Sequence, residues 1–68
     1  MLKHTIGENA GTIWQLLNKE SMLSIKSVQK RTCLTTKDLY LAFGWLAREN
    51  KLYFFDRSNE LYVCLIYD

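Results

Sequence analysis

The chain has 68 residues, of which 49% are hydrophobic and 24% charged, with no proline and a net charge of +2 at neutral pH. This length excludes a second domain, and the composition excludes a disordered tail, so residues 1–68 are expected to form one small globular domain. No apolar run approaches the roughly 18 residues of a membrane span, and the N-terminus lacks an apolar signal region, so we expect a soluble, cytoplasmic protein with no membrane partner.

The first predicted element is an amphipathic helix from about Ile6 to Lys19. Thr5 and Glu8 have the spacing of a capping box, which predicts that the helix starts at Thr5. Trp14 lies beside an apolar stripe whose members are spaced four, three and four residues apart: Ile6, Ala10, Ile13 and Leu17.

The next segment combines two short elements. Met22 to Ile25 can add a short strand to a sheet, and Ser24 can cap a short helix that continues through Arg31. The apolar positions of that helix, Ile25 and Val28, are expected to face inward. Between Ser24 and Lys37 lie four cations and no acid, so this segment carries +4 and the rest of the chain −2: Lys26, Lys30, Arg31 and Lys37. If the chain contacts a polyanion, this segment is expected to do so.

A longer helix follows the residues "TCLT". Thr35 and Asp38 form a second capping box, which predicts a helix from there to about Glu49. On a helical wheel the core stripe contains Leu39, Ala42, Phe43 and Leu46, with Ala47 at its border. The opposite side contains Lys37, Leu41, Gly44 and Arg48, with Tyr40 at its margin and Trp45 on the flank. Gly44 is therefore predicted to face solvent.

After Asn50, which is expected to end the helix, two segments predict an antiparallel hairpin. "KLYFFD" and "LYVCLIYD" are rich in aromatic and branched residues and are separated by "RSNE". Both faces of the second strand are largely apolar, so one face can pack on the helices while the other is available to a partner, with these candidate anchors: Tyr62, Ile66 and Tyr67.

The chemistry of the chain argues against an enzyme. Its single histidine, His4, lies close to an end that tends to fray, so a nucleophilic pair with Cys33 is not expected. Cys33 and Cys64 could pair, but two reduced thiols that act as small hydrophobic residues are favoured, with Cys33 buried in a turn. No metal-ligand spacing, Walker loop or dinucleotide motif is present, so no cofactor, metal or small-molecule ligand is expected.

The order helix, short strand, helix, helix, strand, strand resembles a winged helix-turn-helix domain, an α+β fold with a small antiparallel sheet. The local match is "TCLTTKDLYLAFGWLARENKLYF", in which Leu34 takes the place of the buried turn leucine and "RENKLYF" that of the exit into the wing. Cys33 stands where such turns often have glycine. "IGENAGTIWQLL" and "FGWLARENKL" are similar to blocks in a group of short, stand-alone bacterial winged-helix proteins without an assigned activity.

Binding of double-stranded DNA is the first function that this resemblance implies, with transcription regulation as its usual purpose. The third helix would enter the major groove while the second lies across the backbone and the wing reaches the minor groove. The residues that would make these contacts are Lys26, Lys30, Lys37, Tyr40, Arg48 and Arg57. Leu41 and Gly44 cannot hydrogen-bond base edges through their side chains, so contacts to phosphates are expected rather than sequence-specific readout.

The alternative function is a protein-interaction or homodimerisation module. An exposed glycine allows another backbone to approach closely, and apolar residues beside it would form a patch. The candidate surface on the third helix contains Leu41, Gly44 and Trp45, and the hairpin offers a second candidate. Trp45 can instead fold onto the first helix or under the hairpin, which would remove the patch.

Overall fold

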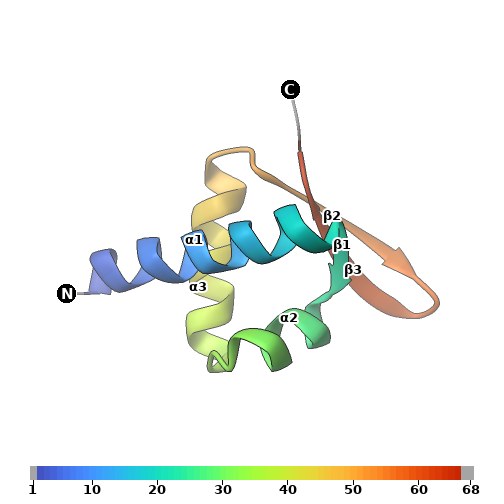
Figure 1. Ribbon diagram of the computed structural model, residues 1–68, viewed down its shortest axis with the longest axis horizontal. Coiled ribbons are helices and arrows are strands. Elements are labelled where there is room, and N and C mark those ends of the chain that lie inside the picture. The colour runs from blue at the N-terminus through green and yellow to red at the C-terminus, as the bar shows by residue number, and fades with distance from the viewer. Residues whose placement is uncertain (1, 67–68) are drawn as a thin grey trace.

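The computed structural model describes the backbone of residues 2–66 and the side chains of residues 5–66. Within these described residues the chain forms three helices and one three-stranded antiparallel sheet, as the sequence predicts (Figure 1). In chain order the elements are α1 (Leu2–Glu20), β1 (Met22–Ser24), α2 (Ile25–Thr32), α3 (Thr36–Arg48), β2 (Leu52–Arg57) and β3 (Glu60–Leu65). α1 crosses α3, α2 lies near the start of α3, and the β2–β3 hairpin projects beyond the helices.

The predicted start of the first helix is wrong. α1 begins at Leu2, so Thr5 lies inside its first turns and does not cap it. The reason is that a helix already running through residues 2–4 supplies carbonyl acceptors for the amides of Gly7 and Glu8, which a capping Thr5 would otherwise have to satisfy.

Side-chain caps start the other two helices as predicted. The backbone N–H of Ser27 donates to Ser24 Oγ at 3.1 Å, and the N–H of Asp38 donates to Thr35 Oγ1 at 3.2 Å. Both caps have extended backbone conformations, which suits a residue that precedes a helix. Ser24 also ends β1, so the strand and the helix share this residue and both expectations for the segment hold.

The turn between α2 and α3 is short and held by one side chain. Gln29 Nε2 donates to the carbonyl oxygen of Leu34 and to Thr36 Oγ1, each at 3.2 Å. Cys33 is exposed and has a left-handed backbone, with φ 60°, so the expectation of a buried cysteine is wrong. Its N–H donates to the Gln29 carbonyl at 2.8 Å, a helix-ending geometry usually given to glycine.

The sheet has β3 at its centre, with β1 and β2 on either side. The strand expected from Leu61 to Asp68 ends earlier, at Leu65, within the part of the chain that the structure describes. A two-residue turn, Ser58 and Asn59, joins β2 and β3, and both residues have positive φ, as a tight hairpin turn requires. The register is unbroken, running from Leu52 opposite Leu65 to Arg57 opposite Glu60.

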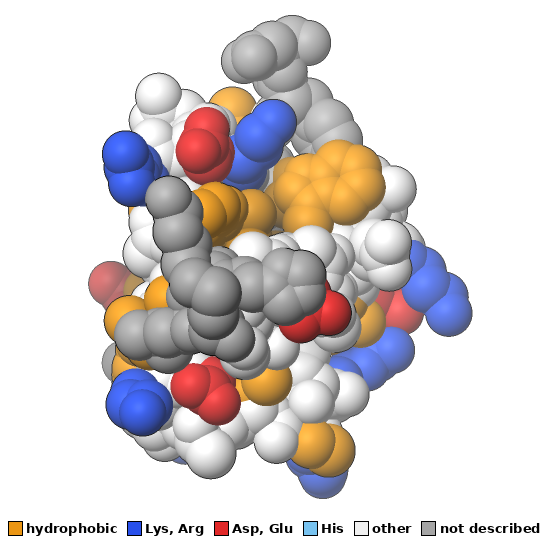
Figure 2. Space-filling model, turned by 90° about the vertical axis from the view of Figure 1, so that its left-hand side faces the viewer, with side chains coloured by type: hydrophobic (Ala, Val, Ile, Leu, Met, Phe, Trp, Pro, Cys, Tyr) orange, Lys and Arg blue, Asp and Glu red, His pale blue; other side chains and the backbone are white. Residues whose placement is uncertain are grey.

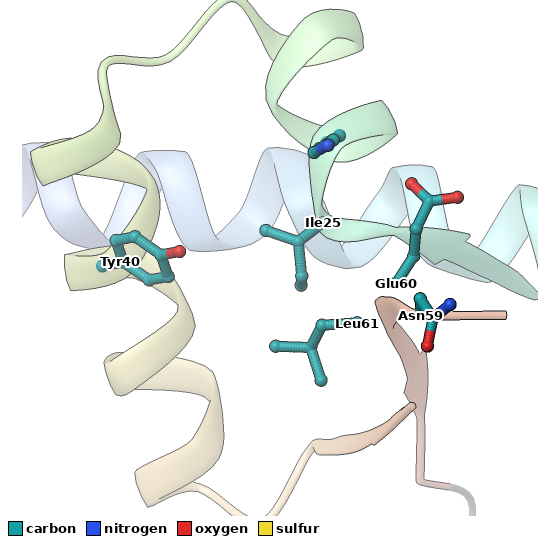
Figure 3. A pocket seen from close by; sticks show the side chains of 6 residues that line it. Ile25, Tyr40, Asn59, Glu60 and Leu61 are labelled. Carbon is teal, nitrogen blue, oxygen red and sulfur yellow. The ribbon is translucent and has the colours of Figure 1, made fainter. Parts of the chain in front are cut away.

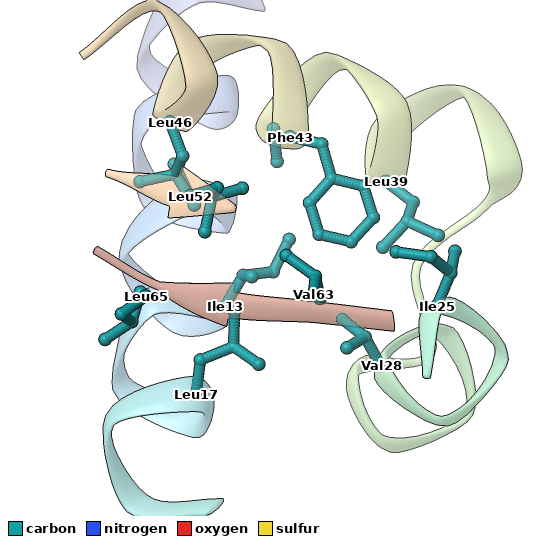
Figure 4. Packing of buried hydrophobic residues seen from close by; sticks show 12 residues of the cluster. Ile13, Leu17, Ile25, Val28, Leu39, Phe43, Leu46, Leu52, Val63 and Leu65 are labelled. Carbon is teal, nitrogen blue, oxygen red and sulfur yellow. The ribbon is translucent and has the colours of Figure 1, made fainter. Parts of the chain in front are cut away.

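The core lies between the three helices and one face of the sheet (Figure 4). The stripes predicted for the helices are buried, including all four core positions of α3, except that Ile6 near the start of α1 is only partly buried. Phe43 contacts the edge of Phe54, with ring centroids 5.6 Å apart at 88°, and so joins α3 to β2. The full buried set is Ala10, Ile13, Leu17, Ile25, Val28, Leu39, Ala42, Phe43, Leu46, Leu52, Val63 and Leu65.

Left-handed backbone and glycine are distributed in an unusual way. Five non-glycine residues in the described chain have positive φ, and all lie at corners between elements: Ser21, Cys33, Asn50, Ser58 and Asn59. The glycines lie instead inside helices and have no positive φ: Gly7, Gly11 and Gly44. The corners therefore use residues that pay a steric cost there, and the helices contain the residue with the weakest propensity after proline.

Candidate nucleic-acid interface

The outward face of α3 carries charge at its two ends. Lys37 lies in the first turn and Arg48 in the last, and both are exposed. A separation of eleven residues places their Cα atoms about 16 Å apart along the helix. Between them Tyr40 is 56% exposed and Leu41 37% exposed. This face is thus basic at its ends and neutral in its middle.

α2 adds two more cations beside this face. Lys26 and Lys30 are exposed and lie one helical turn apart. Neither forms an ion pair with any described residue, and the same holds for Lys37. Arg31 differs, because its Nη2 lies 3.2 Å from Glu20 Oε2 of α1. Of the basic segment in the sequence, three lysines therefore remain available to an anion.

A groove separates α2 and α3 from the wing (Figure 3). Its volume is about 230 Å³, and it is lined by Ile25, Lys26, Tyr40, Asn59, Glu60 and Leu61. Ile25 and Leu61 give it an apolar floor, while Lys26 and Tyr40 come from two different helices. The fold therefore brings two of the six predicted contact residues to one groove beside the wing.

The tip of the wing is not basic. Arg57 stands opposite Glu60 in the hairpin register, and Asp56 precedes it. One cation against two acids gives this tip a net charge of −1. Arg57 therefore lies in an acidic surrounding, unlike the lysines of α2 and α3, although all of them belong to the same predicted set of contact residues.

The proposed interaction surface on α3 is divided between exposed and partly buried residues. Gly44 is exposed, and a Cβ built on it meets no atom within 4 Å. Leu41 is beside it on the same face. Trp45 is half-buried and packs against the core, so part of its side chain is not available to a partner.

Replacing Gly44 by alanine is expected to raise the free energy of unfolding by about 1 kcal/mol, because alanine has the higher helix propensity and meets no steric obstacle. Urea denaturation followed by circular dichroism measures this. Gly44→Ser is a useful companion and should give a smaller gain. A loss of stability in the alanine variant would contradict the open position of Gly44.

The end of the molecule from which α1 starts presents a contrasting surface (Figure 2). Basic and acidic side chains are interspersed there, and neither sign forms a continuous patch on the part of this face that is coloured. The coloured part of this view therefore shows no continuous basic surface.

Two features near the site were not predicted from the sequence. Gln29 was overlooked, although a long amide followed by a turn threonine could have signalled the bridge that it makes. On the sheet face turned away from the core, Tyr53 stacks on Phe55 and Phe55 on Tyr62, with centroids 5.9 and 5.7 Å apart. The alternation of residues along the hairpin suggested the apolar face but not this ordered ladder.

The described residues include no group of three or more histidine, cysteine, aspartate or glutamate side chains that could hold a metal ion. The side chain of His4 and the whole of Tyr67 lie outside the described part of the structure. Within that part, no helix has the length and apolar character needed to cross a membrane.

Comparison with known proteins gives one family and two relatives. The family model "Winged helix-turn-helix domain (DUF2582)" matches residues 1–65. The uncharacterized protein MJ1608 of Methanocaldococcus jannaschii is 36% identical over 50 residues, which is 71% of each chain. The solution NMR structure of protein BT2368 from Bacteroides thetaiotaomicron has a TM-score of 0.82 and 34% identity, covering 96% of this chain and 79% of that one.

Proposed function

The chain belongs to the winged helix-turn-helix family whose family model matches residues 1–65, and we propose that it binds the backbone of double-stranded DNA. The observation that carries the proposal is the set of three exposed lysines on α2 and α3, Lys26, Lys30 and Lys37, none of which forms an ion pair with a described acid. Such cations release counterions from DNA when they contact phosphates.

Each contact residue has a distinct role in this proposal. Lys37 and Arg48, at the two ends of the outward face of α3, contact phosphates on the two sides of the major groove, while Lys26 and Lys30 contact the backbone that α2 crosses. Tyr40 donates its hydroxyl to a phosphate or packs on a sugar. Arg57 contributes least, since Glu60 and Asp56 lower the positive potential around it.

Binding is expected to be weakly dependent on base sequence. Base readout in the major groove needs donors and acceptors such as Asn, Gln or Arg near the middle of the recognition helix. The middle of α3 presents Leu41 and Gly44 instead. The contacts are therefore mainly electrostatic, and a cytoplasmic, non-enzymatic role in transcription regulation or DNA organisation is the process that they would serve.

A fluorescence-anisotropy titration of a random duplex at several salt concentrations tests the proposal. Each phosphate neutralised contributes about −0.9 to the slope of log K against log salt. Engagement of all three lysines and Arg48 predicts a slope near −3.6. Contacts between lysines and phosphates are strongest at low salt, because screening is then weakest. Absence of binding at about 20 mM salt would therefore refute the proposal.

A further inference from the structure

β2 is an edge strand, and half of its peptide groups point away from the sheet. Among the strands that the structure describes, its only neighbour is β3. The N–H of Ile66 donates to the carbonyl of Lys51 at 2.8 Å, which fixes Lys51 as facing β3. Since hydrogen-bonded and non-hydrogen-bonded positions alternate in an antiparallel pair, Tyr53, Phe55 and Arg57 also bond to β3. The peptide groups of Leu52, Phe54 and Asp56 therefore point outward.

The central part of this edge, Leu52 to Phe55, lacks the devices that usually protect one. Natural edge strands avoid pairing with other chains through proline, bulges or charged side chains. The chain contains no proline, and the register of β2 with β3 has no bulge. The four residues from Leu52 to Phe55 contain no charge, and Asp56 is the first acid along the strand.

Exposed aromatic surface accompanies the free edge. Tyr53 is 57% exposed and Phe54 37% exposed, on opposite faces of the strand. Tyr53 belongs to the ladder that continues through Phe55 to Tyr62 on the outer face of the sheet. The ladder stops at β2, where the sheet stops, so one more strand would extend it.

We propose that β2 pairs antiparallel with β2 of a second copy of this chain, which joins the two sheets into one of six strands. With the two-fold axis beside Phe54, every outward peptide group meets an outward group: Phe54 faces Phe54 of the second copy, and Leu52 faces Asp56 of the second copy. On the outer face, Tyr53 meets Phe55 of the second copy, so the aromatic ladder runs on across the interface.

A second copy fits this edge because Tyr53 of each copy meets Phe55 of the other, so two aromatic pairs form about the two-fold axis. The three outward positions are evenly spaced about Phe54, so one antiparallel register uses all of them on both chains. This register also places two like charges opposite each other, Lys51 and Arg57 of the second copy, but both are exposed and lie at the ends of the paired segment. The contact is isologous and uses the β2 edge of both copies, so pairing through this edge closes as a dimer. The proposal does not depend on DNA binding.

Sedimentation equilibrium of the full chain up to about 1 mM, with two matched variants, tests the proposal; the small interface predicts weak association. Tyr53→Lys places a charge at the centre of the edge and should lower the association constant about tenfold or more. Leu41→Lys likewise replaces an exposed apolar side chain by a charged one, but on α3, and should leave the association constant unchanged. A chain that stays monomeric, or a dimer lost in the Leu41 variant and retained in the Tyr53 variant, overturns the proposal.

Amide hydrogen exchange of the unmodified chain provides a readout that needs no variant. In the monomer the amides of Phe54 and Asp56 point to solvent, so they should exchange quickly. In the dimer they are hydrogen-bonded, so their exchange should slow about tenfold or more between dilute and concentrated samples. The amide of Asn59 in the hairpin turn should not change. Dimer formation with unchanged Phe54 and Asp56 exchange would also overturn the proposal.

Discussion

Exchange of Lys26 and Lys37 together for alanine is expected to weaken binding to a random duplex about 30-fold at low salt. Each lysine contributes on the order of 1 kcal/mol through a phosphate contact, and 1.4 kcal/mol corresponds to a factor of ten in affinity. The slope of log K against log salt should become shallower by about 1.8, or 0.9 for each lost contact. Both values come from the same anisotropy titration.

The control for this experiment removes the same charge elsewhere. Lys19 lies in the last turn of α1 and Lys51 between α3 and β2, and both are exposed. Their double alanine variant has the same net charge as the test variant, so it should bind with nearly native affinity and salt slope. Equal losses in the two variants would show that DNA responds to net charge alone and that α2 and α3 form no interface.

Replacement of Phe43 by alanine is expected to lower the free energy of unfolding by about 3–5 kcal/mol. Phe43 is 4% exposed and contacts Tyr40 of its own helix and Phe54 of β2, with ring centroids 6.3 and 5.6 Å apart. Its loss removes buried apolar area and the contact that joins α3 to the sheet. A domain of this size has about 3–10 kcal/mol in total, so the variant should be largely unfolded at 37 °C.

Thermal and urea denaturation of three proteins would measure this effect. Phe43→Leu keeps most of the volume and should lose about 1–2 kcal/mol. Leu41→Ala, on the exposed face of the same helix, should change stability by less than about 1 kcal/mol. A loss below 1 kcal/mol in Phe43→Ala would mean that the helices and the sheet do not depend on this contact.

Helix caps and periodicity were sufficient to predict most of the fold. Ser24 and Thr35 cap helices as expected, because a hydroxyl before an apolar stripe has few competing roles. Thr5 and Glu8 have the same spacing and misled the prediction, since the pattern does not reveal whether earlier residues already continue the helix. The hairpin was predicted, but its strands are longer at the turn than expected. Arg57 and Glu60 belong to the strands, because only Ser58 and Asn59 have the positive φ of the turn.

The candidate site was less predictable than the fold. The wheel correctly placed Lys37, Gly44 and Arg48 on exposed positions of α3. It could not reveal that Arg31 is engaged by Glu20, because that pair joins α1 to α2 across the tertiary structure. The groove that contains Lys26 and Tyr40 likewise depends on how the wing packs beside two helices, which one-dimensional periodicity does not encode. The assignment of these residues to DNA stays a prediction.

The inverse placement of glycine and left-handed backbone has a consequence for protein engineering. Corners such as Cys33 and Asn50 would gain from glycine, while Gly7, Gly11 and Gly44 have open space for a methyl group. None of these changes touches the buried cluster or a lysine of the candidate interface. For a domain of this size each kcal/mol corresponds to roughly 4–8 °C in melting temperature. These substitutions together are therefore expected to raise the melting temperature of the domain well above that of the present sequence, through backbone preferences alone.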